Sequence, residues 1–252
     1  MTSADAGRVA LVTGAGRGIG KATALLLAER GFRVMATARS EDELAALGLD
    51  HVTGDVSDPA DCERIVAATR ERLGPVSVLV NNAGFGSAAE REIWQQDLDA
   101  WRRSFAVNLD GPFHLCRAAV GGMVEQRYGR CVFVSSTAGV VAEARMTAYC
   151  ASKAGLLGLM RGVAKDAGPF GVTSNAVLPG WVRTEMAEVS AREEAERRGI
   201  DAEQIWTERA ATYPIGRVVT PREVAETIAF LSSEGSSGIN GEAVTVALGS
   251  TW

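Results

Sequence analysis

The sequence predicts a single α/β domain in which a doubly wound parallel sheet is covered by helices on both faces. Short apolar runs alternate along the chain with helical patterns of roughly ten to twenty residues, the alternation typical of parallel sheets. A glycine-rich segment separates the first apolar run from the first helical pattern. No internal repeat, low-complexity tract or linker divides the 252 residues, so we expect one domain over residues 1–252.

The expected strands are short apolar runs bounded by glycine, proline or polar residues. The first run, RVALVT at Arg8–Thr13, ends at glycines and has the pattern of a buried strand. Because a segment long enough for a helix separates most neighbouring runs, the strands should pair in parallel. The remaining strands are expected at Phe32–Thr37, His51–Val52, Pro75–Val80, Cys131–Ser135, Val172–Val177 and Ala243–Val246.

Helical spacing or capping signals mark the segments between these strands. Gly18–Arg30 repeats apolar residues at helical spacing. Asp58 followed by Pro59 has the form of an N-cap with proline at the first helical position, so a helix should run from there toward Leu73. Further helices are expected at Glu41–Leu47, Leu98–Val107, Gly111–Gln126, Thr147–Ala167 and Pro221–Leu231.

Composition excludes several classes of function. Hydrophobic content of 46% and charged content of 23% are ordinary for a soluble globular protein, and the net charge of −5 gives no reason to expect nucleic-acid binding. No apolar stretch reaches the length of a membrane span, and MTSADAG lacks the basic-then-apolar pattern of a signal peptide. His51 and His114 are isolated and the cysteines form no C-x-x-C pair. We therefore expect a cytoplasmic protein with reduced thiols and no metal, membrane or nucleic-acid partner.

The segment from Cys131 to Lys153 carries the residues that suggest chemistry. If a helix begins near Thr147, Tyr149-x-x-x-Lys153 places a phenol and an ammonium one turn apart. A neighbouring cation would lower a phenol pKa that starts at about 10. Ser136 follows an apolar run, so its hydroxyl should emerge at the carboxyl end of a strand, where open α/β sheets bind ligands. These groups suffice to polarise and protonate a carbonyl; the alternative is a surface helix with an incidental Tyr-Lys pair.

Glycines follow the first strand in the order TG-x-x-x-G-x-G, over Thr13–Gly20. Glycine there lets the backbone turn sharply and lets a pyrophosphate approach the N–H groups of the next helix. The stricter G-x-G-x-x-G spacing is not met because Ile19 occupies the last glycine position. A glycine-rich turn without a ligand is the alternative.

These motifs together resemble the short-chain dehydrogenase/reductase family. The glycine loop, NNAG at Asn81–Gly84, the Ser-Tyr-Lys set and PG at Pro179–Gly180 occur in the family's order and span nearly the whole chain. The resemblance implies a Rossmann domain with seven parallel strands, a nicotinamide cofactor and a homotetramer, or at minimum a dimer. The pairing surface would be formed by the helices expected at Gly111–Gln126 and Thr147–Ala167.

The resemblance also implies roles for single residues. Tyr149 would be the general acid in reduction, Lys153 would lower its pKa and bond the nicotinamide ribose, and Ser136 would hold the substrate oxygen. Asn108, in FAVNLDG, would position a proton-relay water, or alternatively cap or kink a helix. The implied cofactor contacts are Gly14, Arg17, Ile19, Asp55, Val56, Asn82, Tyr149, Lys153, Val182 and Thr184.

The end of the second strand favours NADPH over NADH. NAD-dependent folds place an acid there, but the expected position, near Ala38, is neutral. Glu41 and Asp42 come later and suit the start of the next helix. Arg17 and Arg39 could clamp a 2′-phosphate between two guanidinium groups, or could merely be exposed.

A helical substrate lid is expected over residues of about 181–215. Its charged run, SAREEAERRGIDAEQIWTER, predicts a solvated helical face. Six apolar residues could close over a substrate or simply pack the helix pair: Trp181, Met186, Val189, Ile205, Trp206 and Tyr213.

The predicted function is NADPH-dependent reduction of a ketone, free or carrier-bound, to a secondary alcohol. The lid and the GGMVEQRYGR segment resemble 3-oxoacyl-carrier-protein reductases and polyketide ketoreductases. PGWV before a long polar lid equally resembles dehydrogenases of small hydroxy acids, and a cyclic alcohol is a further alternative substrate. A non-catalytic nucleotide-sensing protein is the alternative from a different class.

Overall fold

A seven-stranded, wholly parallel sheet forms the centre of the molecule, as the sequence predicts. The computed structural model describes residues 5–86 and 91–250, so the expectation drawn from MTSADAG rests partly on residues outside this range. The strand order is β3-β2-β1-β4-β5-β6-β7. It reverses between β1 and β4, which creates the topological switch point where open α/β sheets bind ligands. The strands are β1 (Val9–Thr13), β2 (Arg33–Ala38), β3 (Asp50–Thr53), β4 (Val76–Asn81), β5 (Gly129–Val134), β6 (Val172–Pro179) and β7 (Ala243–Val246).

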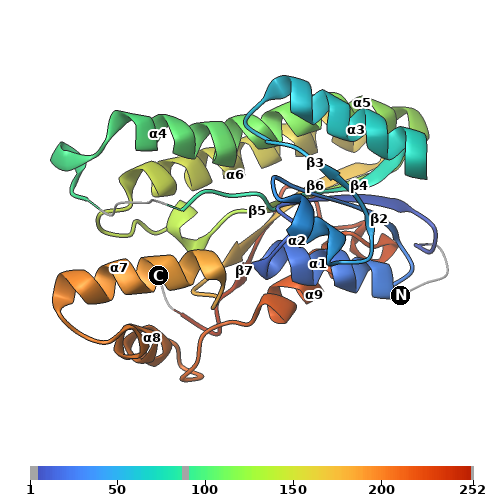
Figure 1. The fold of residues 1–252 in the computed structure, drawn as a ribbon. Coiled ribbons are helices and arrows are strands. Elements are labelled where there is room, and N and C mark those ends of the chain that lie inside the picture. The colour runs from blue at the N-terminus through green and yellow to red at the C-terminus, as the bar shows by residue number, and fades with distance from the viewer. Residues whose placement is uncertain (1–4, 87–90, 251–252) are drawn as a thin grey trace.

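Helices cover both faces of the sheet, and a further helix pair lies beyond one end of it (Figure 1). In this view α3, α4, α5 and α6 lie above the sheet, α1, α2 and α9 lie below it, and α7 and α8 extend to the lower left. The bounds are α1 (Gly18–Glu29), α2 (Glu41–Ala45), α3 (Pro59–Leu73), α4 (Leu98–Phe105), α5 (Gly111–Gln126), α6 (Thr147–Ala167), α7 (Glu185–Arg198), α8 (Ala202–Ala211) and α9 (Pro221–Leu231).

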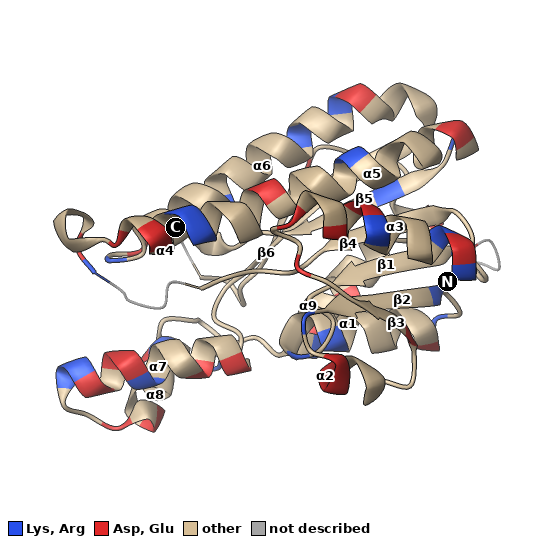
Figure 2. Ribbon diagram, turned by 45° about the horizontal axis from the view of Figure 1, so that its top comes forward, with Lys and Arg blue, Asp and Glu red and all other residues tan. Residues whose placement is uncertain are grey.

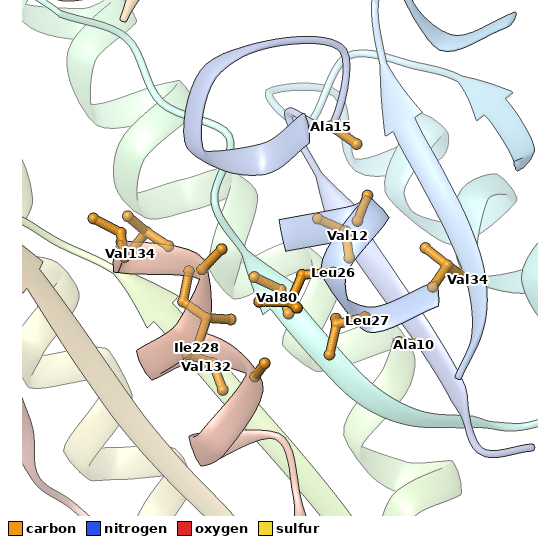
Figure 3. Close-up of a cluster of buried hydrophobic side chains, with 14 of the residues drawn as sticks. Ala10, Val12, Ala15, Leu26, Leu27, Val34, Val80, Val132, Val134 and Ile228 are labelled. Atoms are coloured by element: carbon orange, nitrogen blue, oxygen red, sulfur yellow. The ribbon is translucent and has the colours of Figure 1, made fainter. Parts of the chain in front are cut away.

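The sheet separates two hydrophobic cores. Along β1, Ala10 and Val12 point to the α1–α9 side, whereas Val9 and Leu11 point to the α3–α5–α6 side. Figure 3 shows the first of these cores, where Leu26 and Leu27 of α1 and Ile228 of α9 meet the strands. Both faces of each central strand are therefore buried, which explains why the strands read as continuous apolar runs.

The helix pair α7–α8 has a small core of its own. Ala191, Ala195, Ile205 and Trp206 form it, and charged residues recur along the helix pair (Figure 2). The expected helix pair is therefore present. Within the described residues, no helix is long and apolar enough to cross a membrane.

The main departure from the expected elements lies between α4 and α5. The sequence predicts two helices with a break after Val107, but a π-helical turn over Ala106–Asp110 makes α4 and α5 continuous. An extra residue in the turn keeps Asn108 inside the molecule, where it is 1% exposed. A second departure is that β6 extends to Pro179, two residues beyond the expected end.

Candidate active site

The glycine loop packs so closely against the end of β4 that side chains would not fit. Gly14 has a φ of +62°, and a Cβ there would lie 2.9 Å from both Ala83 Cα and Asn82 Nδ2. A Cβ on Gly20 would collide with the carbonyl of Gly14. These glycines are therefore required by close backbone approach, which supports the ligand loop predicted from their spacing.

Thr13 and Asn82 lock this loop to β4 through hydrogen bonds. Asn82 Nδ2 donates to the carbonyls of Thr13 at 2.8 Å and Gly14 at 3.2 Å. Thr13 Oγ1 accepts from the N–H groups of Asn82 and Ala83, each at 3.0 Å. Sequence reasoning misses Thr13 as a site residue, because its role depends on a partner 69 residues away.

A cavity of about 1330 Å³ lies over the loop and the carboxyl ends of the central strands. The N-terminus of α1 opens toward it without a side-chain cap and without an acid in its first turn, so its N–H groups suit a phosphate. The residues present therefore fit a dinucleotide. Every expected cofactor contact lines this cavity: Gly14, Arg17, Ile19, Arg39, Asp55, Val56, Asn82, Tyr149, Lys153, Val182 and Thr184.

Ser136, Tyr149 and Lys153 line the same cavity, from two elements. Ser136 follows the end of β5, and its Oγ accepts a hydrogen bond from Ala138 N at 3.1 Å. Tyr149 and Lys153 lie one turn apart near the start of α6, with Lys153 Nζ 5.7 Å from the centre of the tyrosine ring. Ser135 Oγ donates to Lys153 O at 3.0 Å and so holds α6 against β5.

Burial dominates the charge states of this pair. It raises the pKa of Tyr149, an effect that a hydrogen bond with Ser136 partly offsets. It lowers the pKa of Lys153 to about 8. Lys153, which is expected to lower this pKa, donates from Nζ to Val134 O at 2.8 Å, and burial is the largest influence on the phenol. Burial thus favours the protonated phenol of Tyr149, the state that a proton donor needs.

Asn108 has a different place from the other expected catalytic residues. Its Oδ1 accepts from Phe85 N at 2.7 Å, and its Nδ2 donates to Phe85 O and to Ser152 Oγ, each at 3.0 Å. In the described part of the chain it does not line the cavity. Its carboxamide instead ties the segment after β4 to α6. Asn108 Oδ1 and Lys153 Nζ both lie beside Gly84, because a Cβ added to that glycine would be 3.6 Å from each.

The two arginines expected to clamp a 2′-phosphate already face carboxylates. Arg17 lies 3.8 Å from Glu43, and Arg39 lies 3.9 Å from Asp55. All four side chains are exposed enough to reorganise, since between 39% and 62% of each is accessible to solvent. Glu43 is a site residue that sequence reasoning misses, because its position in α2 gives no signal of contact with a loop more than twenty residues earlier.

The start of α7 contacts both walls of the cavity. Thr184 caps α7, its Oγ1 accepting from Ala187 N at 3.3 Å, and a Cβ on Gly18 would lie 3.2 Å from its methyl group. A Cβ on Gly86, on the segment after β4, would lie 3.2 Å from the Met186 side chain. The apolar residues expected in the lid therefore fall into two groups. Met186 and Val189 are exposed and line the cavity, whereas Ile205, Trp206 and Tyr213 are buried in packing.

Fold and cavity together define a dinucleotide-binding oxidoreductase of the α/β type. A family model described as enoyl-(acyl carrier protein) reductase matches residues 14–251. The chain belongs to the short-chain dehydrogenase/reductase family, whose cofactor is NAD(P).

Curated relatives and solved structures agree on this membership. The chain is 37% identical over 248 residues to the 3-oxoacyl-[acyl-carrier-protein] reductase FabG of Vibrio cholerae, covering 95% of this chain and 96% of that protein. It is similar in structure to a single-substitution variant of the actinorhodin polyketide ketoreductase with NADPH, with a TM-score of 0.90, 36% identity and coverage of 99% and 98%. It is also similar to NAD⁺-bound xylitol dehydrogenase, with a TM-score of 0.91, 29% identity and coverage of 97% and 99%.

Proposed function

We propose that this protein is an NADPH-dependent ketoreductase that converts a 3-oxoacyl thioester or polyketide-type ketone into a secondary alcohol. The observation that carries the proposal is the convergence of Ser136, Tyr149 and Lys153 on the cavity lined by the glycine loop. The names of the FabG and actinorhodin relatives supply the substrate class. The substrate is either free or bound to a carrier protein, and the free thiols of all four cysteines suit the cytoplasm.

Each residue of the trio has a chemical task. The nicotinamide, when bound, supplies the hydride. Ser136 donates a hydrogen bond to the ketone oxygen, and Tyr149 transfers its phenolic proton to that oxygen. Lys153, held beside the ring by α6, stabilises negative charge on the tyrosine and bonds the ribose. Asn108 supports the trio indirectly by fixing the segment after β4 against α6.

The NADPH preference rests on Arg17 and Arg39, which line the cavity on the glycine loop and after β2. A guanidinium forms charge-assisted hydrogen bonds with a phosphate, and two of them give a clamp. Ala38 at the end of β2 offers no carboxylate to the 2′-hydroxyl of NADH.

The test is cofactor oxidation followed by absorbance, with carrier-thioester mimics, free oxo acids and cyclic ketones as substrates. We expect turnover of at least one ketone, with kcat/KM at least tenfold higher for NADPH than for NADH, or about 1.4 kcal/mol. A strict requirement for NAD⁺ and a hydroxy acid or cyclic alcohol would favour the dehydrogenase alternative, and cofactor binding without any turnover would favour a nucleotide sensor.

Tyr149→Phe is the matched variant, because it removes only the hydroxyl group. We expect kcat/KM to fall by about 10²–10⁴-fold while cofactor affinity stays within about twofold. Retention of more than about a tenth of wild-type kcat/KM would exclude Tyr149 as the proton donor.

A further inference from the structure

Glu43 reaches back from α2 onto the glycine loop. A Cβ on Gly16 would lie 2.5 Å from Glu43 Oε2 and 2.9 Å from Glu43 Cβ, so this side chain occupies the space that the glycine leaves open. Its carboxylate also lies 3.8 Å from the guanidinium of Arg17. Both residues line the cofactor cavity.

Glu41, another acid at the start of α2, does not share this position. Glu41 lies two residues earlier and bonds His51 Nε2 at 2.8 Å, beside the edge strand β3. Together with Leu49, Asp50 and Arg72 it lines a separate cavity of about 510 Å³. Glu43 is thus the α2 acid that faces the phosphate-binding side, and Glu41 provides an internal control with the same charge.

We infer that Glu43 sets the strength of cofactor discrimination by competing with the 2′-phosphate for Arg17. The inference rests on the proposed use of NADPH, and it adds Glu43 as a residue that weakens NADPH binding. In the ligand-free protein Glu43 is the anion beside Arg17, and a 2′-phosphate must displace it to complete the clamp with Arg39. An adenosine ligand without the 2′-phosphate does not compete with Glu43 for Arg17, so Glu43 selectively weakens the binding of the phosphorylated ligand.

The expected size follows from the exposure of the pair. Arg17 and Glu43 are 57% and 39% exposed, so water screens their interaction. Two unit charges about 4 Å apart in water interact by about 1 kcal/mol, which corresponds to about fivefold in Kd. Glu43→Gln keeps the length of the side chain and removes only its charge.

The experiment is calorimetric titration of the full chain with 2′,5′-ADP and with 5′-AMP, for wild type, Glu43→Gln and Glu41→Gln. We expect Glu43→Gln to lower the Kd of 2′,5′-ADP by about fivefold, with the Kd of 5′-AMP unchanged within about twofold. Glu41→Gln should change neither Kd by more than about twofold. An unchanged Kd for 2′,5′-ADP, an equal gain for 5′-AMP, or the same gain in Glu41→Gln would overturn the inference.

An Arg17→Gln background tests whether the competition is for Arg17. In that background Glu43→Gln should lower the Kd of 2′,5′-ADP by less than about twofold. A decrease as large as in the wild-type background would refute competition for this arginine. These titrations contain no ketone. A protein that fails the reduction assay but shows the selective gain would therefore disprove the proposed reaction and leave the role of Glu43 intact.

Discussion

Lys153 shows how burial sets the properties of a single residue. Its ammonium is inside the protein, and only 4% of the residue is exposed. The hydrogen bond that it donates to the Val134 carbonyl replaces only part of the solvation lost. The charged form is therefore disfavoured, and its pKa falls from the ordinary 10.5 to about 8.

This shift predicts a pH dependence of stability in the ligand-free protein. Between pH 8 and 10.5 the unfolded chain keeps the lysine proton that the folded chain has lost, so raising the pH favours folding over this window. We expect the free energy of unfolding of wild type, relative to Lys153→Met, to rise by up to about 3 kcal/mol from pH 7 to 10.5. Urea unfolding at several pH values measures this difference.

Lys165→Met is the control, since it removes an exposed lysine from the same helix. A rise of the same size in Lys165→Met would mean that the rise does not report burial at position 153. A difference between wild type and Lys153→Met that is flat, or that falls with pH, would contradict the lowered pKa.

At the scale of elements, Arg209 joins helices α7 and α8. Its guanidinium donates to Glu194 Oε2 at 3.0 Å and to Ser190 Oγ at 3.2 Å, both on α7. It also lies 3.6 Å from the centre of the Trp181 ring. Because its side chain is only 7% exposed, this interaction is protected from solvent. Arg198 also pairs with Glu194, but its side chain is 40% exposed.

Arg209→Met should therefore loosen the α7–α8 pair and leave the sheet unchanged. Removing one partner of a buried ion pair costs about 3 kcal/mol, so hydrogen exchange across residues 185–211 should accelerate by about 100-fold. Arg198→Met should leave exchange nearly unchanged because its ion pairs are exposed. Hydrogen exchange measured by mass spectrometry on peptides from α7–α8 and from the sheet shows which part of the protein is loosened. Similar acceleration in Arg209→Met and Arg198→Met would refute the special role of Arg209.

At the scale of the molecule, the outer faces of α5 and α6 remain open. Several small and apolar residues of these helices pack in the protein's own core, namely Ala119, Leu156 and Leu157. Phe113, however, is 49% exposed on α5, and a Cβ on Gly122 or Gly158 would meet open space. Small residues there would let a second copy approach closely, which is the basis for proposing a homotetramer.

Gly158→Arg tests this assembly. An arginine fits the isolated chain at this position, so it should disrupt only a contact between copies. We expect light scattering to report a tetramer for wild type and a smaller species for Gly158→Arg, with unchanged helical content. Thr207→Arg, which adds the same charge to the exposed face of α8, should remain tetrameric. A wild-type monomer at micromolar concentration would disprove the assembly.

The sequence alone predicted the parallel sheet and most helices, and its resemblance to a known family predicted that Ser136, Tyr149 and Lys153 share one site. The central strands are buried on both faces, so each leaves a continuous apolar run. Ser136 was expected beside Tyr149 and Lys153 from the order of the family's motifs, whereas helical spacing by itself placed Tyr149 and Lys153 on one turn. The glycine loop was predictable for the same reason, because its spacing reflects a local turn.

Only the tertiary structure decided what depends on contacts distant in the chain. The π-turn holds Asn108 against Phe85, 23 residues away, and α2 brings Glu43 onto the glycine loop. The carbonyl of Val134, 19 residues before Lys153, accepts the hydrogen bond of its ammonium, a contact that helical spacing alone does not reveal. The local sequence pattern predicts which face of a helix or strand is buried. The hydrogen-bond partner of a polar side chain depends instead on how the elements pack together, which the local pattern does not specify.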